Sequence, residues 1–254
     1  MSSFRRQPAI LTLLEVQGSA SVIELATRFG VAGETIRRDL QALLKTGRIE
    51  KVHGGVRLRE EIAEADYVQR LNENKAAKNA IGEAASALIE DGASVLIDSG
   101  TSSYYAARHL DRHSRLSIIT NSLEVARETA RSGRNRVYFI GGEVNNEYLS
   151  TFGVDTMAQV ARYAPTVALL SIGALDPARG ALDFHLDEAN FKQAAAPLAK
   201  RVILLADSTK FDREALVHTL DFSQIHVLVT NKPVPAHFED ALSKVQVLIA
   251  QHTE

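Results

Sequence analysis

Residues 21–57 read SVIELATRFGVAGETIRRDLQALLKTGRIEKVHGGVR, and they hold two helical patterns separated by a glycine. Ser21 and Glu24 have the spacing of a capping box, which satisfies two amide groups at a helix N-terminus. Gly30 supplies the backbone freedom needed at the end of this helix, and a second apolar period begins within three residues. These signals predict a helix-turn-helix.

The second helix of this pair has two chemically different sides, because successive residues advance by about 100°. One side is apolar and carries Ile36, Leu40, Leu43 and Leu44. The opposite side carries Glu34, Arg38, Gln41 and Lys45, flanked by Thr35 and Arg37. The donor fork of Arg38 suits guanine and the amide of Gln41 suits adenine, whereas Arg37, Lys45 and Thr35 suit phosphates. This side predicts a surface that reads DNA bases.

A basic hairpin follows the second helix. Ile49, Lys51 and His53 alternate with Glu50 and Val52, which predicts a strand, and Gly54-Gly55 predicts a two-residue turn before a return strand at 56–58. A ribbon beside a helix-turn-helix is typical of a wing. The predicted DNA-binding residues are Ser21, Glu34, Thr35, Arg37, Arg38, Gln41, Lys45, Lys51, His53 and Arg57.

Charge divides the chain into two parts. Residues 1–59 contain ten Lys or Arg against five Asp or Glu, although the whole chain of 254 residues has a net charge of -2. A basic module on an acidic body favours a protein that meets a polyanion at one end. We therefore expect a winged helix-turn-helix domain at 1–58, a linker at 59–74 and a second domain at 75–254.

Composition excludes several classes of protein. The chain contains no Cys, which removes disulfides and thiolate chemistry, and no apolar run has the length of a membrane span or a signal peptide. The eight His residues do not form a metal-binding motif. We expect a cytoplasmic protein with no metal, no cofactor and no membrane partner.

The second domain alternates short β-branched runs with helical patterns, which predicts an α/β fold with a mainly parallel sheet. Strands are expected at 95–97, 116–120, 137–140, 167–171, 202–206 and 226–229, and helices near 75–90, 104–110, 123–132, 154–162 and 188–199.

Five of these strands are followed directly by small or polar residues. Each such cluster alone also fits a helix cap or a turn. Because ligands of parallel sheets bind beyond the carboxyl ends of the strands, five clusters together predict a ligand-binding rim, with Lys192 and Lys210 available for an anion. Asp98-Ser99-Gly100-Thr101 in particular offers hydroxyls and helix N-terminal amides to a phosphate.

The chain resembles the DeoR/GlpR family of bacterial sugar-metabolism repressors, through Thr35-Ile36-Arg37-Arg38-Asp39-Leu40 and Val52-His53-Gly54-Gly55. The resemblance extends over nearly the whole chain and implies a sensor domain that is similar in fold to ribose-5-phosphate isomerase and the CoA transferases. It also implies that the rim is a pocket for a phosphorylated sugar or polyol. The implied effector-binding residues are Asp98, Ser99, Gly100, Thr101, Ser102, Thr120, Asn121, Ser122, Gly141, Gly142, Gly173, His185, Glu188, Lys192, Asp207 and Lys210.

Several residues near the predicted pocket can be interpreted in more than one way. Residues 181–188 resemble the glycerol-3-phosphate repressor branch, which would place His185 and Asp187 over the pocket. His185 also fits a partly buried loop residue with no ligand role. Glu188 and Lys192 alone would predict a surface ion pair on a helix. Asp212 stands where the family usually has Gly, and its carboxylate would weaken the positive potential of Lys210.

Taken together, the sequence predicts a repressor that binds double-stranded operator DNA and is released by a phosphorylated effector. Two DNA half-sites need two recognition helices, so we expect a homodimer or a homotetramer. Activation instead of repression is equally compatible with the residues. The enzyme alternative is a sugar-phosphate isomerase in which Asp98, Glu188 or Asp207 is the base and Lys192 or Lys210 the electrophile. An isomerase has no use for residues 1–58, so we do not expect an enzyme.

Overall fold

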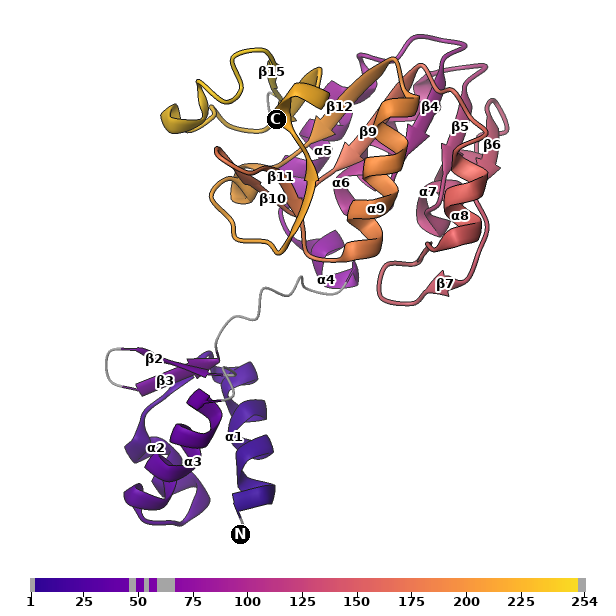
Figure 1. The fold of residues 1–254 in the computed structure, drawn as a ribbon. Helices are drawn as coiled ribbons and strands as arrows, with labels where there is room; N and C mark the ends of the chain where they lie inside the picture. The colour runs from indigo at the N-terminus through magenta and orange to yellow at the C-terminus, as the bar shows by residue number, and fades with distance from the viewer. Residues whose placement is uncertain (1–2, 46–48, 53–54, 59–66, 251–254) are drawn as a thin grey trace. The chain divides into compact units, whose positions relative to one another are not determined.

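The computed structural model describes residues 3–45, 49–52, 55–58 and 67–250 (Figure 1). The chain forms two compact units, residues 1–63 and residues 64–254. Each unit has its own hydrophobic core.

The first unit contains three helices followed by a hairpin in its described part. The helices are α1 (Ser3–Gln17), α2 (Val22–Phe29) and α3 (Gly33–Lys45). The strands β2 (Ile49–Val52) and β3 (Gly55–Leu58) pair in antiparallel fashion, and β1 (Ser19–Ala20) pairs with the other edge of β3. Leu25 of α2 and Ile36 of α3 are fully buried between these elements. The structure therefore has the helix-turn-helix and the hairpin that the sequence predicts.

Local signals set the ends of α2 as expected. The Ser21 hydroxyl accepts a hydrogen bond from the Glu24 amide, and the Ser21 amide donates to the Glu24 carboxylate at 2.7 Å. Gly30 adopts a left-handed conformation with φ of 61° and ends the helix. Helix α1 was not predicted, and its buried Ile10 and Leu14 complete the core against α2 and α3.

The hairpin turn differs from the prediction. Gly55 is the first residue of β3 and pairs with Val52, so it is a strand residue rather than part of the turn. A side chain at this position would place its Cβ 2.4 Å from the carbonyl oxygen of Ala20. Gly55 is therefore explained by the close approach of β1.

The second unit is built on a seven-stranded sheet, in which every pairing is parallel. Its strand order is β15-β14-β12-β9-β4-β5-β6. The strands are β4 (Ser94–Ile97), β5 (Ser117–Thr120), β6 (Arg136–Phe139), β9 (Val167–Ser171), β12 (Arg201–Leu205), β14 (Val227–Thr230) and β15 (Gln246–Ile249). The chain starts in the middle with β4, extends to one edge through β5 and β6, and then fills the other side from β9 outward. A switch point of the topology therefore lies between β4 and β9.

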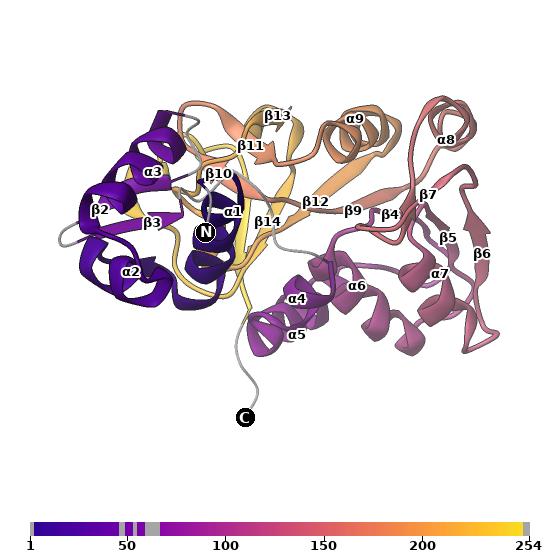
Figure 2. The ribbon, with the colours of Figure 1, turned by 90° about the horizontal axis from the view of Figure 1, so that it is seen from below.

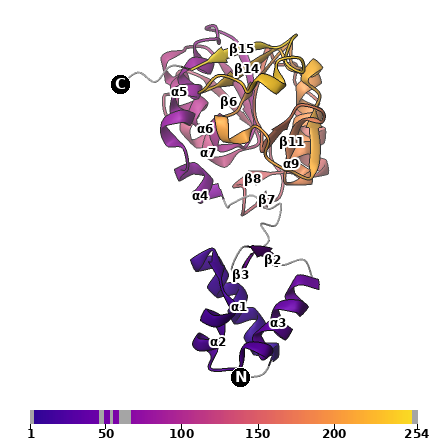
Figure 3. The ribbon, with the colours of Figure 1, turned by 90° about the vertical axis from the view of Figure 1, so that its left-hand side faces the viewer.

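Helices cover both faces of this sheet. Helices α5 (Lys75–Ser86), α6 (Thr101–Arg108) and α7 (Leu123–Ala130) lie on one face, and α8 (Val154–Val160) and α9 (Leu186–Ala195) lie on the other (Figures 2 and 3). Successive residues of β9 point to opposite faces, so Leu169 belongs to one core cluster and Leu170 to the other. The strands are thus apolar throughout because both faces are buried.

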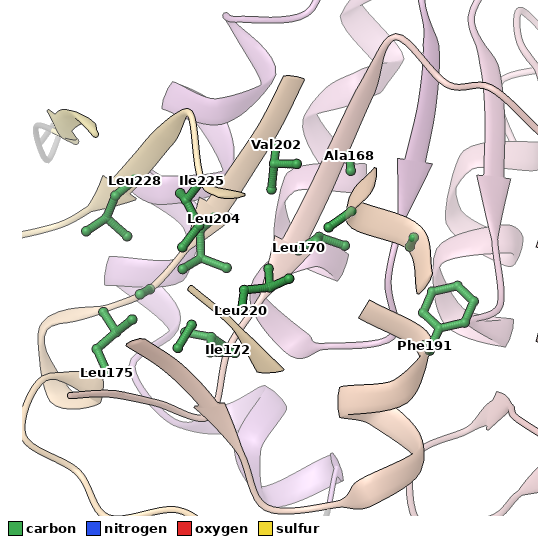
Figure 4. Close-up of a cluster of buried hydrophobic side chains, with 14 of the residues drawn as sticks. Ala168, Leu170, Ile172, Leu175, Phe191, Val202, Leu204, Leu220, Ile225 and Leu228 are labelled. Atoms are coloured by element: carbon green, nitrogen blue, oxygen red, sulfur yellow. The ribbon is translucent and has the colours of Figure 1, made fainter. Parts of the chain in front are cut away.

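A smaller antiparallel sheet lies beside α9 and was not predicted. It consists of β10 (Ala174–Asp176), β11 (Gly180–Asp183) and β13 (Val217–Leu220). Leu220 of β13 packs with Leu170 and Leu204 of the large sheet (Figure 4). A further short pair is formed by β7 (Val144–Asn145) and β8 (Ser150–Thr151). Single 3-10 turns occur at His109–Arg112, Ala196–Leu198, Ser208–Lys210, Phe222–Gln224 and Ala236–Phe238.

Helix α4 (Tyr67–Asn72) lies inside residues 59–74, which were predicted to be a linker. Tyr67 and Arg70 are buried, and the Tyr105 hydroxyl of α6 donates a hydrogen bond to the Leu71 carbonyl at 3.2 Å. These contacts make α4 part of the second unit. Across the described ranges, none of the helices combines the length and the apolar character needed to cross a membrane.

Candidate functional sites

The exposed face of α3 carries the side chains predicted to contact DNA. Glu34, Arg37, Arg38 and Gln41 are exposed, and Thr35 is half-buried. Lys51 on β2 and Arg57 on β3 are exposed as well. Lys45 is the last residue of α3, and His53 lies outside the described residues.

Ser21, Glu34 and Arg37, which are among the predicted DNA-binding residues, have local partners. Ser21 forms the capping box with Glu24, and the Glu34 carboxylate lies 3.2 Å from the Arg37 guanidinium. This exposed ion pair is weak because water screens it. Glu34 is therefore placed to orient the Arg37 side chain on the surface of α3.

Asp39 was quoted in the sequence motif but given no role, and the structure places it in the interior. Its carboxylate accepts a hydrogen bond from the Arg6 guanidinium of α1 at 2.5 Å, and both side chains are buried. This ion pair fixes α3 to α1 and so determines which face of α3 is exposed.

Asp98 and Ser171 meet at the switch point, where β4 and β9 end. The Asp98 carboxylate accepts hydrogen bonds from the Ser171 amide at 3.2 Å and the Ser171 hydroxyl at 2.9 Å, and also from the Ser103 hydroxyl. A Cβ at Gly100 would lie 1.6 Å from the Ser171 hydroxyl, so only glycine permits this approach. The N-terminus of α6 is thereby held against the end of β9.

Lys192 lies at the centre of a buried group of carboxylates, which we call the acid cluster: Asp98, Asp183 and Glu188. The Lys192 ammonium nitrogen is 2.9 Å from the Asp183 carboxylate, 3.5 Å from Asp98 and 3.9 Å from Glu188. Only 2% of the Lys192 side chain is exposed. The predicted pair of Glu188 and Lys192 is thus an interior contact rather than a surface one.

Burial alone would lower the pKa of Lys192, but the attraction of Asp183, Glu188 and Asp98 outweighs it and raises the pKa above its ordinary value. Lys192 is therefore a permanent cation whose charge is taken up by its neighbours. Asp183 is fixed in turn by the Gly173 amide at 3.0 Å and the Thr219 hydroxyl at 3.0 Å.

A small cavity, which we call the inner pocket, opens between the N-terminus of α6 and the acid cluster. Its volume is about 10 Å³. It is lined by Arg70, Thr101, Ser102, Ser171, Ile172, Gly173, Asp183, Glu188, Lys192 and Lys210. Arg70 reaches it from α4, where its guanidinium carbon lies 5.0 Å from the centre of the Tyr148 ring.

Arg70 and Lys210 also line a larger cavity, the outer cleft, with a volume of about 300 Å³. Its lining residues are Arg70, Glu73, Asn74, Lys78, Asp207, Thr209, Lys210 and Arg213. The inner pocket and the outer cleft are therefore neighbours that share two cationic residues.

Other predicted effector residues line neither cavity. Asn121 and Ser122 are buried, and they hydrogen-bond to the Thr151 carbonyl and the Val125 amide respectively. The Thr120 hydroxyl accepts a hydrogen bond from the Ser122 amide, and the Gly141 amide donates one to the Gln159 side chain at 3.1 Å. A Cβ at Gly142 would lie 2.7 Å from the Thr156 hydroxyl oxygen. The His185 ring lies 5.1 Å from that of Tyr148, and its buried Nδ1 atom has no hydrogen-bond partner among the described residues.

Sequence reasoning missed Arg70, Lys78, Asp183 and Arg213. Arg70 fell within the supposed linker, and Lys78 fell on a helix with no motif. Asp183 lies in the segment 181–188 that resembles the glycerol-3-phosphate repressor branch. Its carboxylate, two residues before His185, was a sequence signal that could have placed it in the site. In the part of the chain that the structure describes, no group of three or more His, Cys, Asp or Glu residues is arranged to hold a metal ion.

Family models match both units. Residues 6–61 match a DeoR-like helix-turn-helix domain, and residues 73–232 match a DeoR C-terminal sensor domain. The chain belongs to the DeoR family. The helix-turn-helix unit and the sensor unit accordingly correspond to the two compact units of the structure, and the chain is a transcriptional regulator rather than an enzyme.

Relatives in the DeoR family match the chain over nearly its full length. The transcriptional repressor CsqR of Escherichia coli is 30% identical, with 97% of this chain and 95% of CsqR covered. The glycerol-3-phosphate regulon repressor of Escherichia coli is 29% identical over all of this chain and 98% of its own. Ribose-5-phosphate isomerase A from Methanocaldococcus jannaschii is a solved structure with 13% identity and a TM-score of 0.42, and 56% of each chain is covered.

Proposed function

We propose that this DeoR-family protein is a repressor of genes for carbohydrate or polyol catabolism and that a phosphorylated sugar or polyol releases it from its operator. Residues 1–58 act as the DNA-binding domain, and residues 75–254 act as the effector and oligomerisation domain. The target on DNA implies that the protein acts in the cytoplasm. The observation that carries the proposal is the juxtaposition, in one pocket, of a helix N-terminus, cations and fixed carboxylates.

The phosphate group is proposed to lie at the N-terminus of α6. Thr101 and Ser102, the first two residues of α6, line the inner pocket, and a helix N-terminus favours an anion. Arg70 and Lys210 line the same pocket and add positive charge. Lys192 contributes little attraction because three carboxylates surround it.

The remainder of the effector is proposed to meet the acid cluster. Asp183 and Glu188 line the inner pocket, and carboxylates accept hydrogen bonds from hydroxyl groups. A sugar or a polyol supplies several such hydroxyls. His185 stays a candidate hydroxyl contact, since its buried Nδ1 atom lacks a partner among the described residues.

Effector binding requires a change of conformation in this scheme. A cavity of about 10 Å³ holds about one water molecule, so a sugar phosphate enters only when lining side chains shift. Arg70 is such a side chain, and it lies on α4, the first described helix after residues 59–66. A ligand that binds the shifted arrangement more tightly changes the population of DNA-binding states.

Two half-sites on DNA require two copies of α3. The sensor domain is therefore proposed to form a homodimer or a homotetramer, and the operator to contain paired half-sites.

The proposal is tested by calorimetric titration of a panel of sugar and polyol phosphates, each beside its unphosphorylated counterpart. We expect at least one phosphate ester to bind while its counterpart does not. Lys210→Met should weaken that binding at least tenfold, whereas Lys232→Met, which removes an exposed lysine outside both cavities, should not. Equal binding of the phosphorylated and unphosphorylated forms, or no binding of either, would refute the proposed effector class.

A further inference from the structure

The outer cleft has more positive charge than a single phosphate in the inner pocket requires. Arg70, Lys78, Lys210 and Arg213 are four cations that line it, whereas Glu73 and Asp207 supply two carboxylates. The formal excess is two positive charges. These charges converge on a volume of about 300 Å³, which is enough for part of a small ligand.

Lys78 is the least expected of these cations because it is buried. Only 3% of the residue is exposed, and its ammonium group donates a hydrogen bond to the Arg70 carbonyl near the end of α4. An ammonium group has three donors, so two remain for other partners. A buried charge with incomplete pairing is costly, which makes Lys78 a candidate for a ligand contact.

The groups around Lys78 do not neutralise it. Lys210 and Arg70 repel its charge, while Asp207 and Glu73 attract it. Burial, followed by the repulsion from Lys210, lowers the pKa of Lys78 to about 8. An anion in the cleft would stabilise the protonated form of Lys78 and relieve the repulsion among its neighbours.

The carboxylate of Asp212, which was expected to weaken the positive potential of Lys210, does not line the outer cleft. Its carboxylate lies 2.8 Å from the Nε2 atom of His237, and Asp212 lines neither cavity. Arg213, the next residue, lies over the Phe184 ring at 4.3 Å and donates a hydrogen bond to the Gly173 carbonyl at 3.4 Å. The loop thus turns Arg213 toward the outer cleft and Asp212 toward His237.

Asp207 provides a second polar feature in the cleft. Its Oδ1 atom accepts hydrogen bonds from the amide and hydroxyl of Thr209, but its buried Oδ2 atom has no hydrogen-bond partner among the described residues. A ligand hydroxyl beside the anionic group would satisfy this atom. The outer cleft therefore offers both a cationic and an acceptor group.

We propose that the effector carries a second anionic group, which binds in the outer cleft between Lys78, Arg213 and Lys210 while the first phosphate lies at the N-terminus of α6. This inference rests on the proposed function and narrows its ligand class. The effector is a sugar or polyol with two separated anionic groups, either a bisphosphate or a phosphorylated sugar acid. Arg70 and Lys210, which line both cavities, lie between the two anionic groups.

Calorimetric titration of matched ligand pairs tests the inference. One pair is fructose 6-phosphate with fructose 1,6-bisphosphate, and the other is glucose 6-phosphate with 6-phosphogluconate. In the unaltered protein, the ligand with two anionic groups should bind at least tenfold more tightly in one pair or both. Lys78→Met should reduce this ratio to about one and leave the affinity for the singly charged ligand within about twofold.

Two further variants complete the design. Lys75→Met removes an exposed lysine from α5, the helix that also carries Lys78, and should preserve the affinity ratio. Arg213→Gln should reduce the affinity ratio while leaving the buried Lys78 of α5 in place. If the singly charged ligands bind and the second anionic group adds nothing, the inference is wrong while the proposed function stands. If no phosphorylated compound binds, both fail together.

Discussion

Removal of the Lys192 charge should destabilise the sensor domain far more than removal of a surface lysine. Lys192→Met keeps the length of the side chain but leaves Asp98, Asp183 and Glu188 buried around an uncharged group. Breaking a buried ion pair by removing one partner costs about 3–5 kcal/mol. For a domain of this size, each kcal/mol lowers the melting temperature by roughly 2–4 °C, so we expect a decrease of roughly 6–20 °C.

Differential scanning calorimetry of the full chain measures this change, with Lys200→Met as the matched control. Lys200 is exposed, so its replacement should shift the melting temperature by about 1 °C or less. Since the pKa of Lys192 is raised in the folded protein, its contribution to stability is complete below the pKa of an unfolded lysine and is lost only when the pH rises through the folded value. The deficit of the variant should therefore be constant from pH 7 to 9. A deficit equal to that of Lys200→Met would refute the assignment of Lys192 as the cation that neutralises the acid cluster.

Four other predictions concern DNA binding, the N-terminal cap of α2 and the effect of pH. In salt-controlled gel shifts, Arg38→Ala should weaken operator binding by about 1–3 kcal/mol and relax the sequence preference, whereas Arg37→Ala should weaken binding to all sequences alike. Equal behaviour of the two variants would contradict the assignment of Arg38 to bases and Arg37 to phosphates. Ser21→Ala should cost about 1 kcal/mol in unfolding of the isolated first unit by removing the cap, and an unchanged stability would contradict that role. Because an anion favours protonated Lys78, calorimetric titration should show the affinity for a doubly anionic effector falling about tenfold between pH 7 and 9, whereas the affinity of Lys78→Met should not change with pH. The pKa of about 8 also predicts that the ligand-free protein gains stability above pH 8, because the Lys78 ammonium loses its proton at a lower pH in the folded state than in the unfolded state.

The helix-turn-helix could be predicted because its signals are local. The capping box at Ser21, the glycine at 30 and the apolar period of α3 each lie within a few residues of the element that they define. Helix α1 was harder to predict because it contains Pro8, and proline disfavours a helix interior. Its buried Ile10 and Leu14 gain their role only from packing against α2 and α3. The same holds for Asp39, whose partner Arg6 is 33 residues away.

The candidate site could be predicted only in part, for a related reason. The strand ends of a parallel sheet meet by topology, so the polar residues after β4 and β12 indicated a site without any knowledge of contacts. Asp183 reaches the same place from the small antiparallel sheet, and Arg70 reaches it from α4. The hydrophobic periodicity of β11 and of α4 does not show which other elements they pack against. The burial of Lys192 was hidden for the same reason, because its nearest carboxylate comes from β11 rather than from its own helix.

The central claim is that one end of the chain binds DNA and that a small anion at the other end controls this binding. Fluorescence anisotropy of the full chain with labelled DNA selected from its own genome tests the claim directly. A phosphorylated ligand that binds by calorimetry should dissociate the complex, and Lys210→Met should keep the DNA affinity but lose the response to that ligand. If a tightly bound phosphorylated ligand leaves the anisotropy unchanged, or if no genomic DNA binds, the account is contradicted.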